Sequence, residues 1–282
     1  MTLTTLLDDL VFPEGPRWHD GALYFSDMHA GIVWRLTPQG VASKVLELPA
    51  LPSGLGWLPD GSLHVVSMLD RRFLRVTPLG PVTVADLSSI APYLINDMVI
   101  DRQGRAYIGT FGCDLNGGET PRPTQLFCVH PNGDIKVAAE DILFPNGAVI
   151  TPDGKTLIVA ETFGNRLTAF DISSSDGALT RRSVFAQFDQ TILPDGICLD
   201  QEGAIWVASA SGNKLIRVKQ GGEITDNIAL PDRNSYACML GGPDRRDLYI
   251  CTAQHFLPER TRTLRSGRIE VMRVAVPGAG LP

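Results

Sequence analysis

The chain has 282 residues, a formal net charge of −6, and near-average shares of apolar (44%) and charged (20%) residues. This composition excludes an intrinsically disordered chain, and the lack of any apolar stretch of about 18 residues excludes a transmembrane helix. No run of Lys and Arg exceeds two residues, which argues against a surface that follows a nucleic-acid backbone. We therefore expect a folded protein that acts on a small molecule, without nucleic-acid or membrane partners.

The N-terminal segment and the cysteines indicate the compartment. Asp8 and Asp9 are the charged residues near the start, so the basic region of a secretory signal is missing. The five cysteines are odd in number and form no C-x-x-C pair, which argues against a disulfide framework or a zinc ribbon. We expect buried, reduced thiols and a cytoplasmic protein, and the sequence leaves the oligomeric state open.

A turn followed by a short β-rich run occurs six times, and these runs begin at residues 22, 62, 105, 155, 204 and 247. Each unit continues with further runs of alternating apolar and polar residues, as half-buried strands require. Four strands in each repeat of about 45 residues are typical of a propeller blade. The sequence therefore predicts an all-β fold, one six-bladed β-propeller over residues 1–282 with four antiparallel strands per blade and little helix; a two-sheet sandwich is the alternative.

The ends of the chain indicate how the ring closes. The sixth unit has three strands within residues 235–274 and no fourth. Residues 6–15 (LLDDLVFPEG) closely match residues 138–147 (AAEDILFPNG), where the outer strand of the third unit leads into the fourth. We expect residues 3–11 to form the outer strand of the last blade, which removes the free edge of an open ring.

One position at the start of the innermost strand carries an oxygen donor in five of the six units. The equivalent residues are Glu14, Ser53, Asn96, Asn146, Asp195 and Ala237. Innermost strands line the channel, so these side chains should converge on its axis. Buried carboxylates require a compensating cation, and oxygen donors favour Ca²⁺, then Mg²⁺ or Mn²⁺, with Zn²⁺ disfavoured. Asn-Gly and Asp-Gly are also common turn dipeptides, so a turn-forming role stays open.

These motifs resemble the regucalcin/gluconolactonase family (senescence marker protein-like), six-bladed propellers that are metal-dependent lactonases; diisopropyl fluorophosphatase has a related build. The resemblance covers essentially the whole chain. It rests on E-G-P at Glu14, N-D with a following D-x-x-G (Asn96, Asp101, Gly104), P-N-G at Asn146, P-D-G at Asp195, and the closing pattern ACMLGGPDRRDLYICTA. It implies that Glu14, Asn146 and Asp195 bind one divalent cation and that Asn96 joins them or contacts substrate.

The resemblance also bears on substrate binding. Asp114 matches an acidic substrate-contacting position, whereas Leu94 stands where regucalcin has a substrate-binding Arg, which argues against polyhydroxylated sugar lactones. Two long loops, Phe111–Thr124 and Ala253–Gly267, should form the rim that selects substrate. The second loop carries His255, a candidate substrate contact, together with Arg260, Arg262 and Arg265. The apolar rim residues Phe111, Phe256 and Leu257 favour a less polar or aromatic lactone.

The resemblance implies a metal-dependent lactonase of the gluconolactonase type. In this mechanism the metal polarises the lactone carbonyl and Asp195 deprotonates the attacking water, although direct attack by Asp195 stays open. Serine-hydrolase, zinc-protease and nucleotide-binding motifs do not occur in a fitting context. Two alternatives remain: a phosphotriesterase like diisopropyl fluorophosphatase that uses the same four residues, and a non-catalytic calcium-binding propeller.

Overall fold

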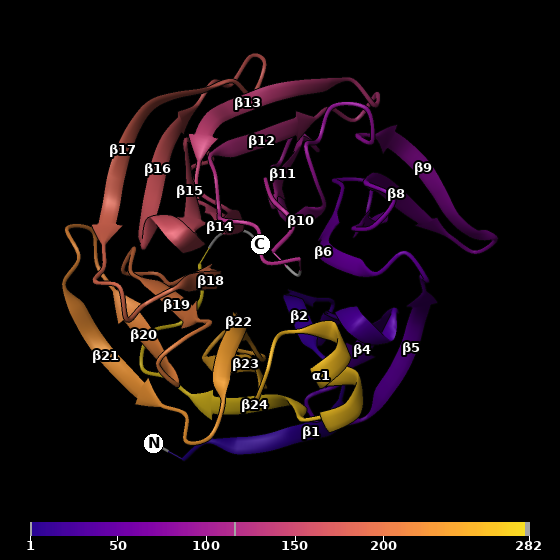
Figure 1. The fold of residues 1–282 in the computed structure, drawn as a ribbon. Helices are drawn as coiled ribbons and strands as arrows, with labels where there is room; N and C mark the ends of the chain where they lie inside the picture. The colour runs from indigo at the N-terminus through magenta and orange to yellow at the C-terminus, as the bar shows by residue number, and fades with distance from the viewer. Residues whose placement is uncertain (1, 116, 280–282) are drawn as a thin grey trace.

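Six four-stranded antiparallel sheets surround a central channel in the computed structural model, which describes residues 2–115 and 117–279 (Figure 1). From the channel outward, blade 1 contains β2 (Pro13–His19), β3 (Ala22–Asp27), β4 (Ile32–Leu36) and β5 (Ala42–Glu47). Blade 2 contains β6 (Pro52–Trp57), β7 (Leu63–Ser67), β8 (Arg72–Thr77) and β9 (Gly80–Asp86). Blade 3 contains β10 (Ile95–Ile100), β11 (Ala106–Thr110), β12 (Thr124–Val129) and β13 (Ile135–Ile142).

The second half of the chain repeats this order. Blade 4 contains β14 (Pro145–Ile150), β15 (Thr156–Glu161), β16 (Arg166–Ile172) and β17 (Leu179–Gln187). Blade 5 contains β18 (Pro194–Leu199), β19 (Ile205–Ser209), β20 (Lys214–Val218) and β21 (Ile224–Ala229). Blade 6 contains β22 (Asn234–Gly241), β23 (Asp247–Ala253), β24 (Gly267–Arg273) and β1 (Thr4–Leu10). The prediction of a six-bladed propeller is confirmed.

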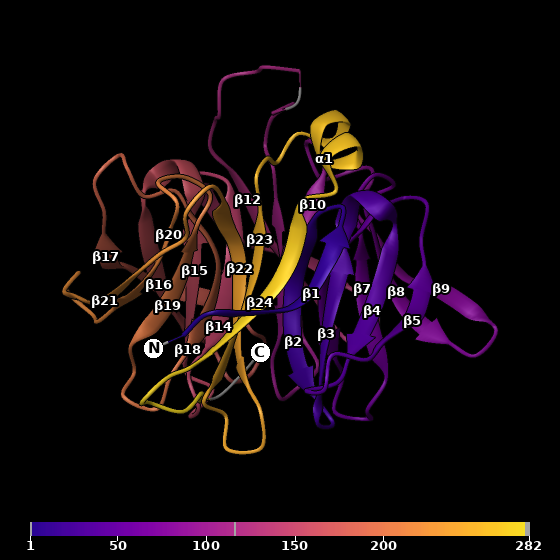
Figure 2. The same ribbon diagram turned by 90° about the horizontal axis from the view of Figure 1, so that it is seen from below.

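Helical structure is scarce in the described residues, as predicted. It consists of the single helix α1 (Pro258–Leu264) and two short 3₁₀ turns, η1 (Met28–Ala30) and η2 (Thr162–Gly164). None of these segments has the length and apolar character needed to span a bilayer. The helix α1 and the β11–β12 loop rise from the same end of the propeller (Figure 2), hereafter the upper end.

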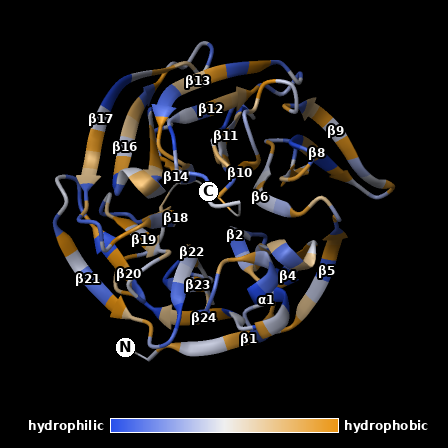
Figure 3. Cartoon of the chain, viewed as in Figure 1, coloured by the Kyte–Doolittle hydropathy of each residue, from blue (hydrophilic) through white to orange (hydrophobic). Residues whose placement is uncertain are grey.

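Burial follows the distance of each strand from the channel. Every residue of the innermost strands β10, β14 and β18 is buried, because these strands pack between neighbouring blades. The outermost strands β5, β9, β13 and β21 have many exposed residues, and their polar and apolar residues intermix along the rim (Figure 3).

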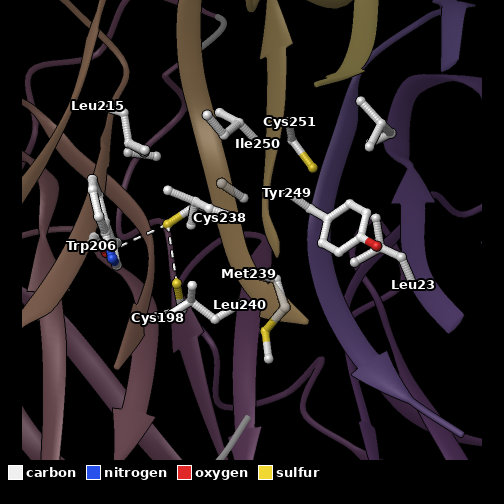
Figure 4. Packing of buried hydrophobic residues seen from close by; sticks show 14 of the residues in the cluster. Leu23, Cys198, Trp206, Leu215, Cys238, Met239, Leu240, Tyr249, Ile250 and Cys251 are labelled. Atoms are coloured by element: carbon white, nitrogen blue, oxygen red, sulfur yellow. Dashed lines mark hydrogen bonds between the residues drawn. The ribbon is translucent and has the colours of Figure 1, made fainter. Parts of the chain in front are cut away.

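The interior between blades 5, 6 and 1 contains three of the five cysteines (Figure 4). The Sγ atoms of Cys198 and Cys238 lie 3.6 Å apart, and Cys238 also donates to the Trp206 carbonyl. Burial, followed by the neighbouring Cys198, raises the pKa of Cys238 well above its usual range, so the thiol keeps its proton. All five cysteines are buried and unpaired, as the sequence predicts.

The ring closes through the N-terminal strand. As predicted, β1 pairs with β24 and completes blade 6. The chain then enters blade 1, where the Asp27 carboxylate accepts hydrogen bonds from the backbone N–H groups of Phe12 (2.7 Å) and Val11 (3.1 Å). Asp27 therefore ties the closing segment to the first blade.

We expect Asp27→Ala to lower the free energy of unfolding by about 1.5–3 kcal/mol, because two buried N–H groups lose a charged acceptor. Urea denaturation of the wild type and the variant measures this difference. Asp8→Ala, on the exposed face of β1, is the control and should leave the midpoint unchanged. A loss at Asp27 below about 0.5 kcal/mol, the usual range for surface substitutions, would show that the carboxylate does not secure the closure.

Candidate functional site

The second residue of five innermost strands points toward one end of the channel axis. Glu14, Ser53, Asn96, Asn146 and Asp195 hold this place in β2, β6, β10, β14 and β18, and all are buried. In every case the pairing with the next strand is irregular at this residue or directly after it. Such bulges redirect side chains beside functional sites, so the repeated irregularity brings one polar residue per blade toward the centre.

Four of these five residues are followed by a glycine, which allows the innermost strands to approach one another. A Cβ atom on Gly147 would lie 2.6 Å from the Ile197 backbone nitrogen, and one on Gly196 would lie 2.5 Å from the Ala237 Cβ. The Asn-Gly and Asp-Gly pairs therefore lie within strands, not in turns. Glycine is required there because neighbouring blades meet backbone to backbone.

Hydrogen bonds join the polar residues into one group. Asn96 Nδ2 donates to Asn146 Oδ1 (3.2 Å), and Asn146 Nδ2 donates to the Thr162 hydroxyl (3.2 Å). The Ser53 hydroxyl donates to Asn96 Oδ1 (3.2 Å). Ser53 does not line the cavity above the site and instead orients Asn96.

Two carboxyl side chains, Glu14 and Asp195, lie among these buried polar residues. Burial, followed by the negative charge of Asp97, raises the pKa of Glu14, and burial together with the charge of Glu14 raises that of Asp195. Asp195 Oδ1 is buried and has no hydrogen-bond partner within the described residues. Asp195 therefore offers a buried carboxylate oxygen that a bound cation or a proton would satisfy.

These observations fit a hard divalent cation. Two carboxylates balance its charge, Asn96 and Asn146 add amide oxygens, and the unpartnered Asp195 Oδ1 supplies a free lone pair. Within residues 2–115 and 117–279, no three His, Cys, Asp or Glu side chains gather as a metal site would require. A cation here would therefore depend on the two amides as well as on the two carboxylates.

A cavity of about 400 Å³ opens above Glu14, Asn96, Asn146 and Asp195. Fifteen of its twenty-two lining residues are apolar or aromatic, among them Phe12, Leu94, Phe111, Phe163, Tyr236 and Phe256. Its volume lies in the usual range for small-molecule sites. The four polar residues thus form the floor of a largely apolar chamber.

Helix α1 covers part of the cavity mouth. Thr261 Oγ1 lies 2.8 Å from His29 Nδ1, and Arg262 Nε donates to the His29 carbonyl (3.2 Å). Burial lowers the pKa of His29 to about 4, with Arg262 adding to the effect, so this ring is neutral at pH 7. Of the rim arginines, Arg262 lines the cavity, whereas Arg265 pairs with Asp9 at 2.8 Å.

The structure does not bring two expected substrate contacts to the cavity wall. Asp114 caps its own loop by accepting the Gly117 N–H (2.8 Å), and residue 116 of this loop lies outside the described part of the chain. His255 Nδ1 accepts the N–H groups of Phe256 and Leu257 (3.0 Å each). Neither residue lines the cavity, whereas Phe256 and Leu94 do.

The sequence did not reveal a buried ion pair next to the site. Arg17 donates to Asp97 Oδ1 (2.7 Å) and to the Met98 carbonyl, and the exposed fractions of the Arg17 and Asp97 side chains are 5% and 10%. Asp97 directly follows Asn96, but only the fold brings blades 1 and 3 close enough for this contact. Thr162 and Tyr236 were also missed, and both line the cavity.

The chain has clear relatives. The family model described as "SMP-30/Gluconolactonase/LRE-like region" matches residues 12–254. A pentonolactonase of Haloferax volcanii is 28% identical over 90% of this chain and 86% of its own length. A 6-deoxy-6-sulfogluconolactonase of Pseudomonas putida is also 28% identical, over 96% of this chain and 94% of its own. Among solved structures, regucalcin of Agrobacterium tumefaciens, described as a calcium-binding protein, superimposes with a TM-score of 0.84 at 22% identity, covering 100% of this chain and 96% of that one.

Proposed function

The chain belongs to the SMP-30/gluconolactonase/LRE-like family, and from this premise we propose that it is a metal-dependent hydrolase that opens lactones. Relatives that cover about nine-tenths of the chain are lactonases, which supports the reaction class. The observation that carries the proposal is the buried group of two carboxylates and two amides at the floor of a cavity. Glu14, Asn96, Asn146 and Asp195 would hold one divalent cation, with Ca²⁺ preferred by an all-oxygen donor set.

A cation held there supplies Lewis-acid activation of the ester carbonyl and stabilises the negative charge that develops on its oxygen. Asp195 accepts the proton of the attacking water, because its carboxylate lies at the cavity floor, where it is the proton acceptor nearest to a water bound beside the amides in this proposal. Ser53 and Thr162 hold the Asn96 and Asn146 amides in place through their hydroxyl groups. The surrounding apolar side chains exclude bulk water from the reacting ester.

Removal of the metal tests the proposal. The protein is stripped with a chelator, and hydrolysis of sugar, alkyl and aromatic lactones and of one phosphotriester is followed with a pH indicator. We expect less than a tenth of the activity without metal, recovery with Ca²⁺, Mg²⁺ or Mn²⁺, and a higher unfolding temperature with the metal that binds.

Each other outcome has a defined meaning. Turnover of the phosphotriester in preference to every lactone would replace the lactonase proposal with the phosphotriesterase alternative. Metal binding without any turnover would favour the non-catalytic alternative. Full activity in the stripped protein would refute the role proposed for the cation.

A further inference from the structure

Aromatic side chains form one wall of the cavity where blades 6 and 1 meet. The Phe12 ring stacks on His29, with 4.6 Å between ring centroids, and meets Tyr236 edge-on at 4.7 Å. Phe12 and Tyr236 are buried, and all three residues line the cavity. This wall is held rigidly, because the His29 ring is fixed by Thr261 and its backbone carbonyl by Arg262.

A second aromatic wall comes from blades 3 and 4, across the ring from the first (Figure 1). The Phe111 and Phe144 rings lie 4.5 Å apart, and Phe163 meets Phe144 edge-on at 5.1 Å. Leu94 of blade 3 also lines the cavity and packs in one apolar cluster with Phe12, Phe111 and Tyr236. A ligand above the polar floor therefore lies between two aromatic surfaces.

The polar groups of the upper cavity are mostly engaged with the protein itself. The Thr162 hydroxyl donates to the Pro194 carbonyl (2.8 Å) and accepts from Asn146. The His29 ring faces Thr261, and Arg262 bonds through Nε to the His29 carbonyl at the mouth. The Tyr236 hydroxyl is itself buried, so it adds no exposed polar group to the wall.

This arrangement disfavours a substrate with several hydroxyl groups. A polyol placed between the two walls would lose hydrogen bonds to water, and the aromatic surfaces offer no replacement. An alkyl or aryl substituent would bury its surface against the same side chains at no such cost. The polar floor would still bind the ester oxygens.

We propose that the substrate is a lactone whose ring carries an apolar substituent, aromatic or alkyl, held between the walls of blades 6–1 and 3–4. This inference rests on the proposed lactonase function and defines its substrate class. It distinguishes the chain from the pentonolactonase and the sulfogluconolactonase that it resembles. Leu94 and Phe111 are then specificity-determining residues.

The test compares lactones of one ring size. The metal-loaded protein is assayed with γ-nonalactone and γ-phenyl-γ-butyrolactone, against xylono-1,4-lactone and unsubstituted γ-butyrolactone. We expect kcat/KM to be at least about tenfold higher for the two apolar-substituted lactones than for the other two, because even one or two methylenes in an apolar pocket give discrimination of this size.

Substitutions of Leu94 show whether the cavity wall of blades 3 and 4 determines the preference for apolar-substituted lactones. Leu94→Arg should lower kcat/KM for the apolar-substituted lactones by about tenfold or more, and Leu94→Gln, which adds no charge, should act in the same direction. Leu79→Arg makes the same change on a fully exposed turn between β8 and β9 and should leave activity unchanged. Unfolding temperatures establish that each variant is folded.

The results distinguish a failure of the substrate inference from a failure of the proposed lactonase function. If xylono-1,4-lactone is hydrolysed as fast as γ-nonalactone or faster, the apolar-substrate inference is wrong and the lactonase function stands. If the Leu94 variants act like Leu79→Arg, the wall does not select the substrate. If no lactone is hydrolysed with any metal, the proposed function fails and this inference with it.

Discussion

Asp195→Asn should reduce kcat for lactone hydrolysis by about 10²–10⁴-fold, the range that a positioned general base contributes. The amide has nearly the same shape as the carboxylate but cannot accept the proton of the attacking water. It also removes one of two buried carboxyl groups whose pKa values are raised first by burial, with the charge of Glu14 adding to the effect on Asp195 and that of Asp97 to the effect on both. We therefore expect the variant to fold with an unfolding temperature at or above that of the metal-free wild type.

Steady-state kinetics at saturating metal measure this effect, so that weaker cation binding is not mistaken for slower chemistry. Asp20→Asn is the matched control, because Asp20 lies in the exposed turn between β2 and β3 with 86% of its side chain accessible. Its activity should equal that of the wild type. If Asp195→Asn keeps more than about a tenth of wild-type kcat, Asp195 is not the base.

Arg17→Met should lower the free energy of unfolding by about 3–5 kcal/mol, the cost of leaving a buried charge without its partner. Asp97 would then lie uncompensated beside Glu14 and Asp195, whose pKa values its charge already raises. The Pro16 and Met98 carbonyls would also lose the hydrogen bonds that the Arg17 guanidinium donates. Urea unfolding of the metal-free protein measures the loss.

Two further variants separate charge from packing. Arg17→Met combined with Asp97→Asn should recover a large part of the lost stability, because the second change removes the unpaired carboxylate. Arg72→Met removes a half-exposed arginine that faces Asp86 at 3.4 Å and should have a much smaller effect. Equal losses for Arg17→Met and Arg72→Met would contradict the structural importance assigned to the buried pair.

The repeat made the fold and the floor of the site predictable. Glu14, Asn146 and Asp195 are each the second residue of an innermost strand, so their equivalent places in the sequence repeat predicted that they lie at the same level of the channel. The match between residues 6–15 and 138–147 likewise gave the closing strand, because equivalent segments of equivalent blades have the same surroundings. A sequence repeat predicts the position of a residue wherever neighbouring units make the same contacts.

Contacts that occur once could not be predicted in this way. Arg17 and Asp97 lie 80 positions apart, and within the described residues no other ion pair joins the innermost strands of two blades in this way. Asp114 and His255 belong to rim loops without periodicity, and there the local hydrogen bonds to Gly117 and Phe256 decide where each side chain points. Helix α1 lies in one of these loops, and its contact with His29 depends on blade 1.

The most direct test of the account is the rate of lactone hydrolysis measured while the stripped protein is titrated with Ca²⁺. Calorimetry on the same sample gives the fraction of sites filled. We expect one Ca²⁺ site per chain and a rate of hydrolysis that rises in proportion to the occupancy of that site. The double variant Glu14→Gln, Asp195→Asn should lose both Ca²⁺ binding and hydrolysis. A rate that is already maximal in the metal-free protein, or that does not change as the site fills, would contradict the account.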